Sequence, residues 1–519
     1  MLLHPTITTE SNNSTRKQIK SMVNRKSMVA TALAMLLAAC GGGGGGSAAV
    51  VTPPVTTAPT PLVTFNNALI HDTDLVVAGS TYYIFGSHLT AAKSTDLMNW
   101  TTFANGVNAT NPLFANVLTD LTATFSWSTV TDLWRPAVFQ LPDGKFYMYY
   151  DSCQGSSPLS AMGVAVADQI GGPYVNKATI LKSGTGVANY DQTVMPNVID
   201  PYLFYDAAHK LWMIYGSYSG GIFILAIDPA TGLPVAGQGY GKHLMGGNNS
   251  PIEGSNVLYV PQTGYYYLFS AFGGMASSDG YNIRVARSTN PDGPYLDGLG
   301  NDMAGVKSNL SLPFPDSATI APYGQELLGN YQFGLANGET GTPPGYVSPG
   351  GASTYYRAAS NEYFIIFHTL FPNQGNYFEA RVHAMYINAD DWPVIAPLRY
   401  APLSLNPTAL NPTVASTDVP GSYKVVNFGK TISGSINNSQ VVQFNADGTL
   451  SGALSGSWTY KGANAASPNV TNITIASAGG GVFNGVLSRQ FNSSSNSFEV
   501  TFSALSIGGV TLWGIRTGT

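Results

Sequence analysis

Short runs of aromatic and β-branched residues alternate along this chain with turns rich in Gly, Ser and Asn. Each of five such runs follows a turn: 80–88 (STYYIFGSH), 144–152 (GKFYMYYDS), 209–217 (HKLWMIYGS), 264–272 (GYYYLFSAF) and 361–369 (NEYFIIFHT). Another apolar run precedes each of them, and no stretch has the period of a long amphipathic helix. Repeated β units of this kind are typical of a propeller, in which each unit is one blade. The pattern therefore predicts an all-β chain with a five-bladed β-propeller over about 64–405, in which the Gly/Pro/Asn-rich stretch 300–350 is an insertion.

The C-terminal part of the chain has a different composition. Residues 408–519 are rich in Ser, Asn, Gly and Thr and contain short alternating runs, which predict a small β-barrel or sandwich domain. Its expected function is to pack against the propeller, and polysaccharide binding is the alternative. Trp458 and Trp513 suit either its core or such a binding surface.

The N-terminus has the features of an export signal. A basic region precedes the apolar segment 28–39 (MVATALAMLLAA), which is too short to span a bilayer, and Cys40 follows. Residues 37–40 (LAAC) resemble the lipobox of bacterial lipoproteins, whose cysteine is acylated, and an ordinary signal peptide is the alternative. We expect a lipoprotein-type signal over 1–40 and a Gly/Pro/Thr-rich tether over 41–63. The chain would then be exported and either lipid-anchored at the bacterial outer membrane or cell surface, or secreted.

Composition narrows the partners. Hydrophobic residues make up 44% of the chain and charged residues only 10%, which suits a large β-rich core and excludes disorder. The net charge is -5 and the body has no basic run, so we expect no nucleic-acid partner. Cys153 is the only cysteine besides Cys40, which predicts a core without an internal disulfide.

The register of the repeats selects three carboxylates. Counting back 11 to 13 residues from the central aromatic residue of each repeat reaches the start of the preceding strand. Asp72, Asp200 and Glu253 occupy this position in three repeats, and Pro136 occupies it in another. Asp74 lies two residues further on and falls out of this register. We expect the three carboxylates to meet around the central channel of the propeller.

Carboxylates that share a pocket raise one another's pKa values, which is costly in a structural site and useful for acid–base chemistry. Glycoside hydrolysis needs one protonated carboxyl group and one carboxylate. Turn capping or metal binding by these acids is the structural alternative. Trp134 could offer a stacking face to a sugar, and Ser217 and Ser219 place hydroxyl groups just after a strand of the third repeat.

Several motifs together resemble glycoside hydrolase family 43, most closely its two-domain bacterial endo-α-1,5-L-arabinanases: HDTDL (71–75), DLWRPAV (132–138), NVIDPYLFYD (197–206), SPIEGSNVLY (250–259) and RVHAMYINADDWPVIAPLRY (381–400). The resemblance implies a five-bladed propeller, hydrolysis with inversion, and arabinan, a side chain of pectin, as the substrate. It implies that Asp72 is the general base, that Glu253 is the general acid, and that Asp200 tunes the acid's pKa and orients the substrate. It further implies that Gly155, Asn197, Ser217 and Ser219 contact arabinose units.

The chain departs from the family pattern on the channel axis. Gly351 stands where relatives have a histidine that binds calcium, so no metal ligand is assigned, although calcium remains the metal that the resemblance implies. His368 and His383 are candidate substitutes, and a buried histidine satisfied by the backbone is the interpretation we favour for both. Arg135 is a candidate for the missing positive charge.

Three functions are therefore compared. The first is a monomeric, exported enzyme that cleaves internal arabinan linkages. The second is an exo-acting arabinofuranosidase or xylosidase of the same family. The third is a surface lipoprotein that binds glycans without cleaving them, for which three mutually repelling carboxylates would have no use.

Overall fold

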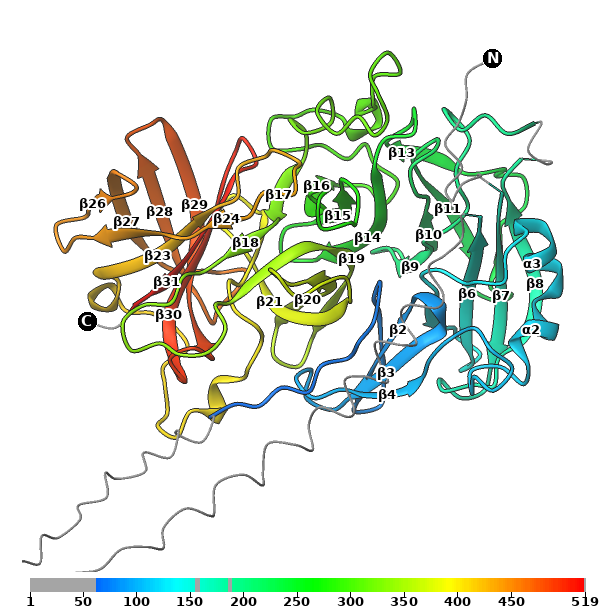
Figure 1. The fold of residues 1–519 in the computed structure, drawn as a ribbon, viewed down its shortest axis with the longest axis horizontal. Coiled ribbons are helices and arrows are strands. Elements are labelled where there is room, and N and C mark those ends of the chain that lie inside the picture. Colours follow the sequence, from blue (N-terminus) through cyan, green and yellow to red (C-terminus); the bar gives the residue numbers. More distant parts are fainter. Residues whose placement is uncertain (1–61, 155–158, 185–188, 518–519) are drawn as a thin grey trace, which may run out of the picture. The chain divides into compact units, whose positions relative to one another are not determined.

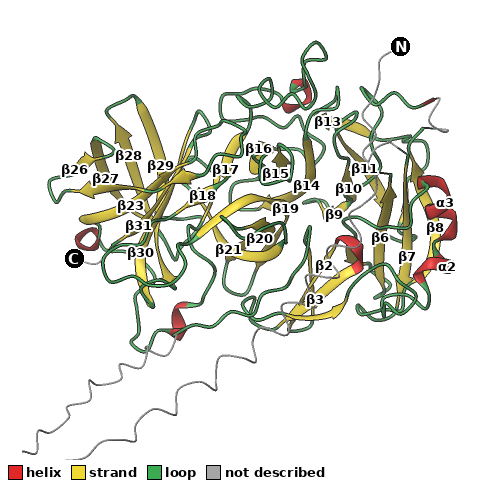
Figure 2. Ribbon diagram, in the orientation of Figure 1, coloured by secondary structure: helices red, strands yellow, loops and turns green. Residues whose placement is uncertain are grey.

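The computed structural model describes residues 62–154, 159–184 and 189–517. This part of the chain is almost entirely β-structure (Figure 2). Its α-helices are two short ones, α2 (Val117–Asp120) and α3 (Thr122–Ser128). Within the described ranges, no helix is long and apolar enough to cross a membrane. The predicted signal and all but the last two residues of the tether lie outside the described residues.

Five antiparallel sheets form the blades of a propeller, as predicted, and the aromatic run of each repeat is the second strand of its blade (Figure 1). The strands are β1 (Asp74–Ala78), β2 (Thr81–Gly86), β3 (Thr90–Ser94) and β4 (Thr101–Ala104) in blade one; β5 (Ala137–Gln140), β6 (Phe146–Cys153), β7 (Ser160–Ala167) and β8 (Val175–Lys182) in blade two; β9 (Tyr202–Tyr205), β10 (Leu211–Tyr215), β11 (Ile222–Asp228), β12 (Leu233–Pro234) and β13 (Lys242–Met245) in blade three; β14 (Ile252–Val260), β15 (Tyr265–Phe272), β16 (Asn282–Ser288) and β17 (Gln325–Leu328) in blade four; and β18 (Tyr331–Gln332), β19 (Gly345–Arg357), β20 (Glu362–Leu370), β21 (Glu379–Ile387) and β22 (Pro393–Ile395) in blade five.

The innermost strands close a ring. Strand β1 contacts β5, β5 contacts β9, β9 contacts β14, β14 contacts β19, and β19 returns to β1. The start of each innermost strand therefore lies beside the central axis, where the register of the repeats placed the three carboxylates.

The stretch 300–350 is only partly an insertion. It supplies β17, the outer strand of blade four, and β18, which pairs with the beginning of β19. Both strands are short and separated by Gly- and Pro-rich loops, so their β pattern is weak in the sequence.

The C-terminal region forms a closed eight-stranded barrel, which decides between the predicted barrel and sandwich. Its strands are β23 (Gly421–Asn427), β25 (Gln440–Phe444), β26 (Thr449–Gly452), β27 (Gly456–Ala463), β28 (Thr471–Ser477), β29 (Gly481–Asn492), β30 (Ser497–Ser506) and β31 (Thr511–Arg516). Strand β31 pairs with β23 and closes the barrel. Trp458 packs against Phe444 and donates its Nε1–H to the carbonyl of Asn445, so it is occupied within the barrel.

The barrel and blades four and five share one apolar core. Trp513 of β31 is fully buried in it and packs edge-on against Tyr331 of β18. Between β23 and β25, the short strand β24 (Asn437–Asn438) leaves the barrel and pairs in parallel with β18 (Figure 1). Lys424 of β23 forms an ion pair of 2.6 Å with Glu339 of the loop before β19, and both side chains are only 5% exposed. These contacts favour packing as the function of the barrel.

Candidate active site

A cavity of about 570 Å³ opens on the axis of the propeller and contains all three predicted carboxylates. The residues that line it are His71, Asp72, Trp134, Cys153, Gln154, Gln192, Asn197, Ile199, Asp200, Ser217, Tyr218, Ser219, Asn249, Glu253, Met275 and Phe314. Asp74 is not among them. The register count therefore separates the two aspartates of the HDTDL motif as expected.

The backbone presents the carboxylates in an unusual way. Asp72 and Asp200, each two residues before an innermost strand, have φ angles of 55° and 58°. Aspartate is one of the few residues that tolerate this left-handed conformation, because its short side chain can bond locally. Glu253 lies at the start of β14, where the pairing with β15 shifts register between Glu253 and Asn256. Such an irregularity re-aims a side chain next to a site.

Contacts around Asp72 favour its ionised form. Its Oδ2 accepts a hydrogen bond of 2.6 Å from the hydroxyl of Ser87, and its backbone N–H donates to Nδ1 of His368 at 2.9 Å. The imidazole of His71 lies 3.6 Å from Oδ2. Burial alone would raise the pKa, but the two imidazoles and the hydroxyl hold the pKa of Asp72 well below its usual range.

The pKa of Glu253 is shifted in the opposite direction. Burial, followed by the nearby charge of Asp72, raises the pKa of Glu253 to about 7. This happens although Ser217 donates to Oε2 at 2.7 Å and Tyr281 donates to Oε1 at 3.0 Å, since both hydrogen bonds favour the charged form. Glu253 therefore carries a proton over much of the range below neutral pH.

Asp200 lies close to two further buried ionisable side chains, Asp151 and Arg135. Burial and the charges of Glu253 and Asp72 raise its pKa well above the usual range. Its Oδ2 accepts from Gly254 N–H at 3.0 Å, and its own N–H donates to Oδ2 of Asp151 at 3.2 Å. The guanidinium of Arg135, a fully buried side chain, opposes the rise in Asp200, Asp151 and Glu253. Arg135 thus places a buried positive charge close enough to affect these three carboxyl groups.

Asp74 is buried away from the cavity. Its Oδ2 accepts from the backbone N–H of Val138, at 2.8 Å, and ties β1 to β5. Burial raises the pKa of Asp74 to about 7. This aspartate is a packing residue between two blades.

Four of the five residues predicted to contact sugar line the cavity, and the fifth lies outside the described residues. Trp134, Asn197, Ser217 and Ser219 all line the cavity. The indole Nε1–H of Trp134 donates to the carbonyl of Cys153 at 3.3 Å, which fixes the ring at the cavity wall. Gly155 lies outside the described residues.

Comparison with known proteins agrees with this geometry. The family model described as glycosyl hydrolases family 43 matches residues 64–310, and a model described as a C-terminal lipocalin-like domain matches residues 397–514. Extracellular endo-alpha-(1->5)-L-arabinanase 2 of Bacillus subtilis is 48% identical over 457 residues, which cover 87% of this chain and 94% of that protein. This chain belongs to glycosyl hydrolase family 43.

Other members of family 43 extend the comparison. The extracellular endo-alpha-(1->5)-L-arabinanase of Thermotoga petrophila is 41% identical over 87% of this chain and 94% of its own length. Its crystal structure superposes with a TM-score of 0.81 over 88% of this chain and the whole of that chain. The crystal structure of the family 43 YxiA protein of Bacillus licheniformis, at 47% identity, superposes with a TM-score of 0.82 over 89% of this chain and the whole of that chain. The two-domain architecture is thus shared throughout, and the chain is a glycoside hydrolase.

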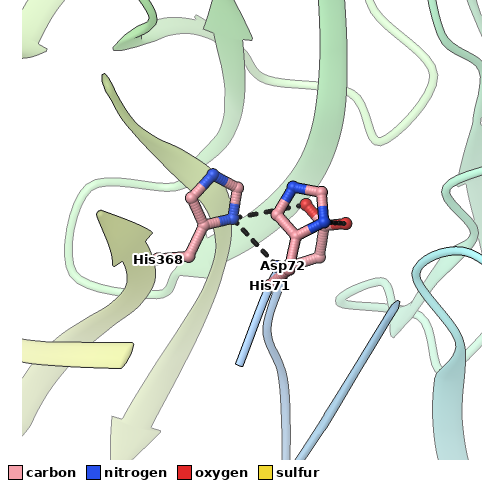
Figure 3. A group of neighbouring side chains, drawn as sticks. All are labelled: His71, Asp72 and His368. Atoms are coloured by element: carbon pink, nitrogen blue, oxygen red, sulfur yellow. Dashed lines mark hydrogen bonds and ion pairs between the residues drawn. The ribbon is translucent and has the colours of Figure 1, made fainter. Parts of the chain in front are cut away.

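The histidines on the axis bear on the metal that family 43 implies. His71, Asp72 and His368 hold potential ligand atoms within 4.8 Å of one another (Figure 3). Nε2 of His368 is buried and has no hydrogen-bond partner among the described residues. Binding of a cation by Nε2 requires the proton to lie on Nδ1, where it would be donated to Oδ1 of Asp72, 3.4 Å away, in place of the hydrogen bond that Nδ1 accepts from the backbone N–H of Asp72. These residues fit a cation on the axis.

Gly351 and His383 have different surroundings. A Cβ on Gly351 would lie 2.3 Å from Oδ1 of Asp72 and 2.6 Å from Nδ1 of His368, so a histidine at 351 is excluded and His368 occupies that space. His383 is buried between the carbonyl of Ala396 and the hydroxyl of Tyr346, at 2.7 and 2.8 Å. The interpretation as a buried histidine satisfied by the backbone fits His383. It fits His368 in part, because the backbone N–H of Asp72 donates to Nδ1 whereas Nε2 has no partner among the described residues.

Sequence reasoning missed several groups that touch the carboxylates. Ser87 follows β2 and Tyr281 precedes β16, and neither stands out in a chain with 29 tyrosines and many serines. Asp151 lies in the second strand of blade two, and only its position one residue before the end of an aromatic run connects it with the axis. His71, directly before Asp72, is the one that adjacency could have identified.

Proposed function

We propose that this enzyme hydrolyses internal α-1,5-L-arabinofuranosyl linkages of arabinan with inversion. The observation that carries the proposal is the opposite tuning of two carboxylates in one cavity, the pKa of Asp72 being lowered and that of Glu253 raised to about 7. The names of the relatives that are 48% and 41% identical support arabinan as the substrate and an internal site of cleavage.

The proposed reaction assigns one step to each carboxyl group. Asp72, already ionised, takes a proton from a water molecule whose oxygen attacks the anomeric carbon. Glu253 donates its proton to the glycosidic oxygen as the carbon–oxygen bond breaks. Because the water attacks from the face opposite the leaving group, the configuration inverts, which requires about 6.5–9.5 Å between the two carboxyl groups.

Asp200 acts through charge and position. The charge of Glu253 raises the pKa of Asp200, so ionisation of either carboxyl group opposes ionisation of the other. The Asp200–Gly254 hydrogen bond connects it to the residue next to Glu253. We assign Asp200 to tuning the acid and orienting the substrate.

Substrate and cation would meet around these groups. Trp134, Asn197, Ser217 and Ser219 are assigned to contacts with arabinose units, and Gly155 is assigned to the same task on the family resemblance alone. Calcium held by His368 would add positive charge beside Asp72 and favour its ionised form.

The proposal extends to domains and location. We assign residues 64–405 to the catalytic domain and 408–519 to the accompanying β domain. We also infer that residues 1–40 direct export, that 41–63 are a tether, and that Cys40 is acylated in a monomeric protein. The word extracellular in the relatives' names supports export. Labelling cells with a radioactive fatty acid tests the anchor: the full chain should incorporate label and Cys40→Ala should not, and label in both would contradict it.

Product analysis tests the activity. Linear arabinan should yield a ladder of oligosaccharides from the first minutes, with products of inverted configuration by NMR, while xylan and aryl-glycosides should resist hydrolysis. Release of arabinose alone would identify the exo-acting alternative. A chelator should lower the rate and added calcium should restore it; an unchanged rate in the metal-stripped enzyme would contradict a functional cation at His368.

A further inference from the structure

A second cavity, of about 290 Å³, lies at the same end of blade five as His368. In the pairing of β20 with β21, His368 is opposite Ala380, and Glu379 and Arg381 flank Ala380 on the other face of the sheet. Glu379, Arg381 and Arg399 line this cavity and are its only charged residues. Its walls combine apolar side chains, among them Phe65, Phe371 and several prolines, with polar ones such as Asn67 and Gln374.

The two arginines are held in place, and the one carboxylate of the cavity pairs with Arg381. Arg381 lies 2.8 Å from Glu379 and is only 7% exposed, and its guanidinium lies 4.5 Å from the ring centre of Phe371. Arg399 lies 3.9 Å from the ring centre of Phe65 and donates to the side-chain oxygen of Asn67 at 2.7 Å. Among the described residues, no carboxylate lies within ion-pairing distance of Arg399. The cavity therefore has one excess positive charge.

The excess charge lowers the pKa values of nearby basic side chains. Burial and then the charge of Arg381 lower the pKa of Arg399 to about 9. Burial lowers the pKa of His383 to about 3, and the two arginines contribute in the same direction. Arg399 is half-buried and has no carboxylate partner to balance its charge, so a site with this balance gains by binding an anion.

The shape of the site narrows the ligand. A planar guanidinium binds a carboxylate through two parallel hydrogen bonds, and apolar walls suit the face of a sugar ring. A volume of about 290 Å³ accommodates a single sugar unit better than a chain. We propose that Arg399 and Arg381 bind the carboxylate of a uronic acid residue attached to the arabinan that the cavity of Asp72 and Glu253 cleaves. The inference rests on the proposed function for the nature of the attached chain, and on its own geometry for the acidic sugar.

Binding of free galacturonate to the full-length enzyme tests the site directly. Calorimetry should show binding by the wild type that weakens at high salt, and Arg399→Gln should bind about tenfold less tightly or worse, the loss expected for a hydrogen bond to a charged group. Arg357→Gln is the matched control. Like Arg399, Arg357 lies over an aromatic ring, in its case that of Phe364, but it has a carboxylate partner in Glu362. It should bind galacturonate as the wild type does. Equal binding by Arg399→Gln and the wild type would overturn the inference.

Two further measurements separate the alternatives. Arg399→Lys keeps the charge but loses the planar fork, so it should fold and still bind galacturonate several-fold less tightly than the wild type; undiminished binding would overturn the bidentate geometry. Inorganic phosphate that binds as tightly as galacturonate would replace the uronic acid with a general anion. On substrates, Arg399→Gln should lower the ratio of kcat/KM for uronate-bearing arabinan to that for linear arabinan, and an unchanged ratio would refute the link to the substrate. Failure of the wild type to cleave linear arabinan would refute the proposed function alone, because galacturonate binding is measured without turnover.

Discussion

Replacing Gly351 by alanine tests whether the close contact between blades one and five sets the position of Asp72. The added Cβ would lie 2.3 Å from Oδ1 of Asp72. Restoring an ordinary separation of about 3.4 Å requires a displacement of about 1.1 Å, the difference between the two values. A misplacement of about 1 Å can cost about 100-fold in rate, equivalent to roughly 2.7 kcal/mol of transition-state stabilisation. Strain adds to this, since φ at Gly351 is 52° and a side chain in that conformation costs about 1–3 kcal/mol of folding stability.

Gly79 provides a matched control for the strain. It has a φ of 60° in the turn between β1 and β2, and nothing lies within 4 Å of its added Cβ. Gly79→Ala should therefore lose stability from the backbone alone and keep its activity. We expect Gly351→Ala to lose more stability in thermal unfolding and about 100-fold in kcat/KM on linear arabinan. If both variants lost the same stability and neither lost activity, the contact between Gly351, Asp72 and His368 would not position the base.

Three further changes have distinct expected outcomes. Asp72→Asn should reduce kcat by about 10²–10⁴-fold by removing the base. Asp74→Asn should stay within a few-fold, because burial raises the pKa of Asp74 to about 7 and an amide oxygen can still accept from the backbone N–H of Val138; the reverse ranking would refute the register assignment. Activity should fall as pH rises through about 7, where Glu253 loses its proton, and Ser217→Ala should move that limb to higher pH because the hydroxyl favours the ionised form; a limb that moved down or stayed would contradict the assignment of the acid. Lys424→Met should lower the free energy of unfolding by about 3–5 kcal/mol, because it leaves the buried carboxylate of Glu339 without its ion-pair partner. Chemical denaturation measures this change. A decrease in the free energy of unfolding below about 1 kcal/mol would show that the ion pair does not hold the two domains together.

The fold was largely predictable because each blade repeats the same local pattern. The aromatic runs at 80–88 and 361–369 identify second strands, and their turns separate the units. Equivalent positions in equivalent units then brought Asp72, Asp200 and Glu253 together, since the innermost strands start at the axis. The barrel was predictable as β-structure, but its closure depends on the pairing of its first and last strands, which no local pattern records.

The parts of the site that sequence named only as candidates depend on contacts across the axis. His368 meets Asp72 from a strand 296 residues away, and it lies at the end of a second strand rather than at the start of an innermost one. The equivalent position in blade five holds Gly351, and its missing side chain makes room for that imidazole. Arg135 was identified as a charge on the axis, but its complete burial becomes visible only once five blades surround it.

The pairing of β24 with β18 determines how this protein can be divided. Strand β18 would otherwise leave unpaired backbone groups at the rim of blade five, and an open rim of this kind recruits other chains. The barrel covers that rim with its own backbone and buries Trp513 against the same blade. A truncation before residue 408 would therefore yield a propeller that aggregates, and not an active enzyme of smaller size. Chimeric enzymes made from this scaffold should exchange the propeller and the barrel together.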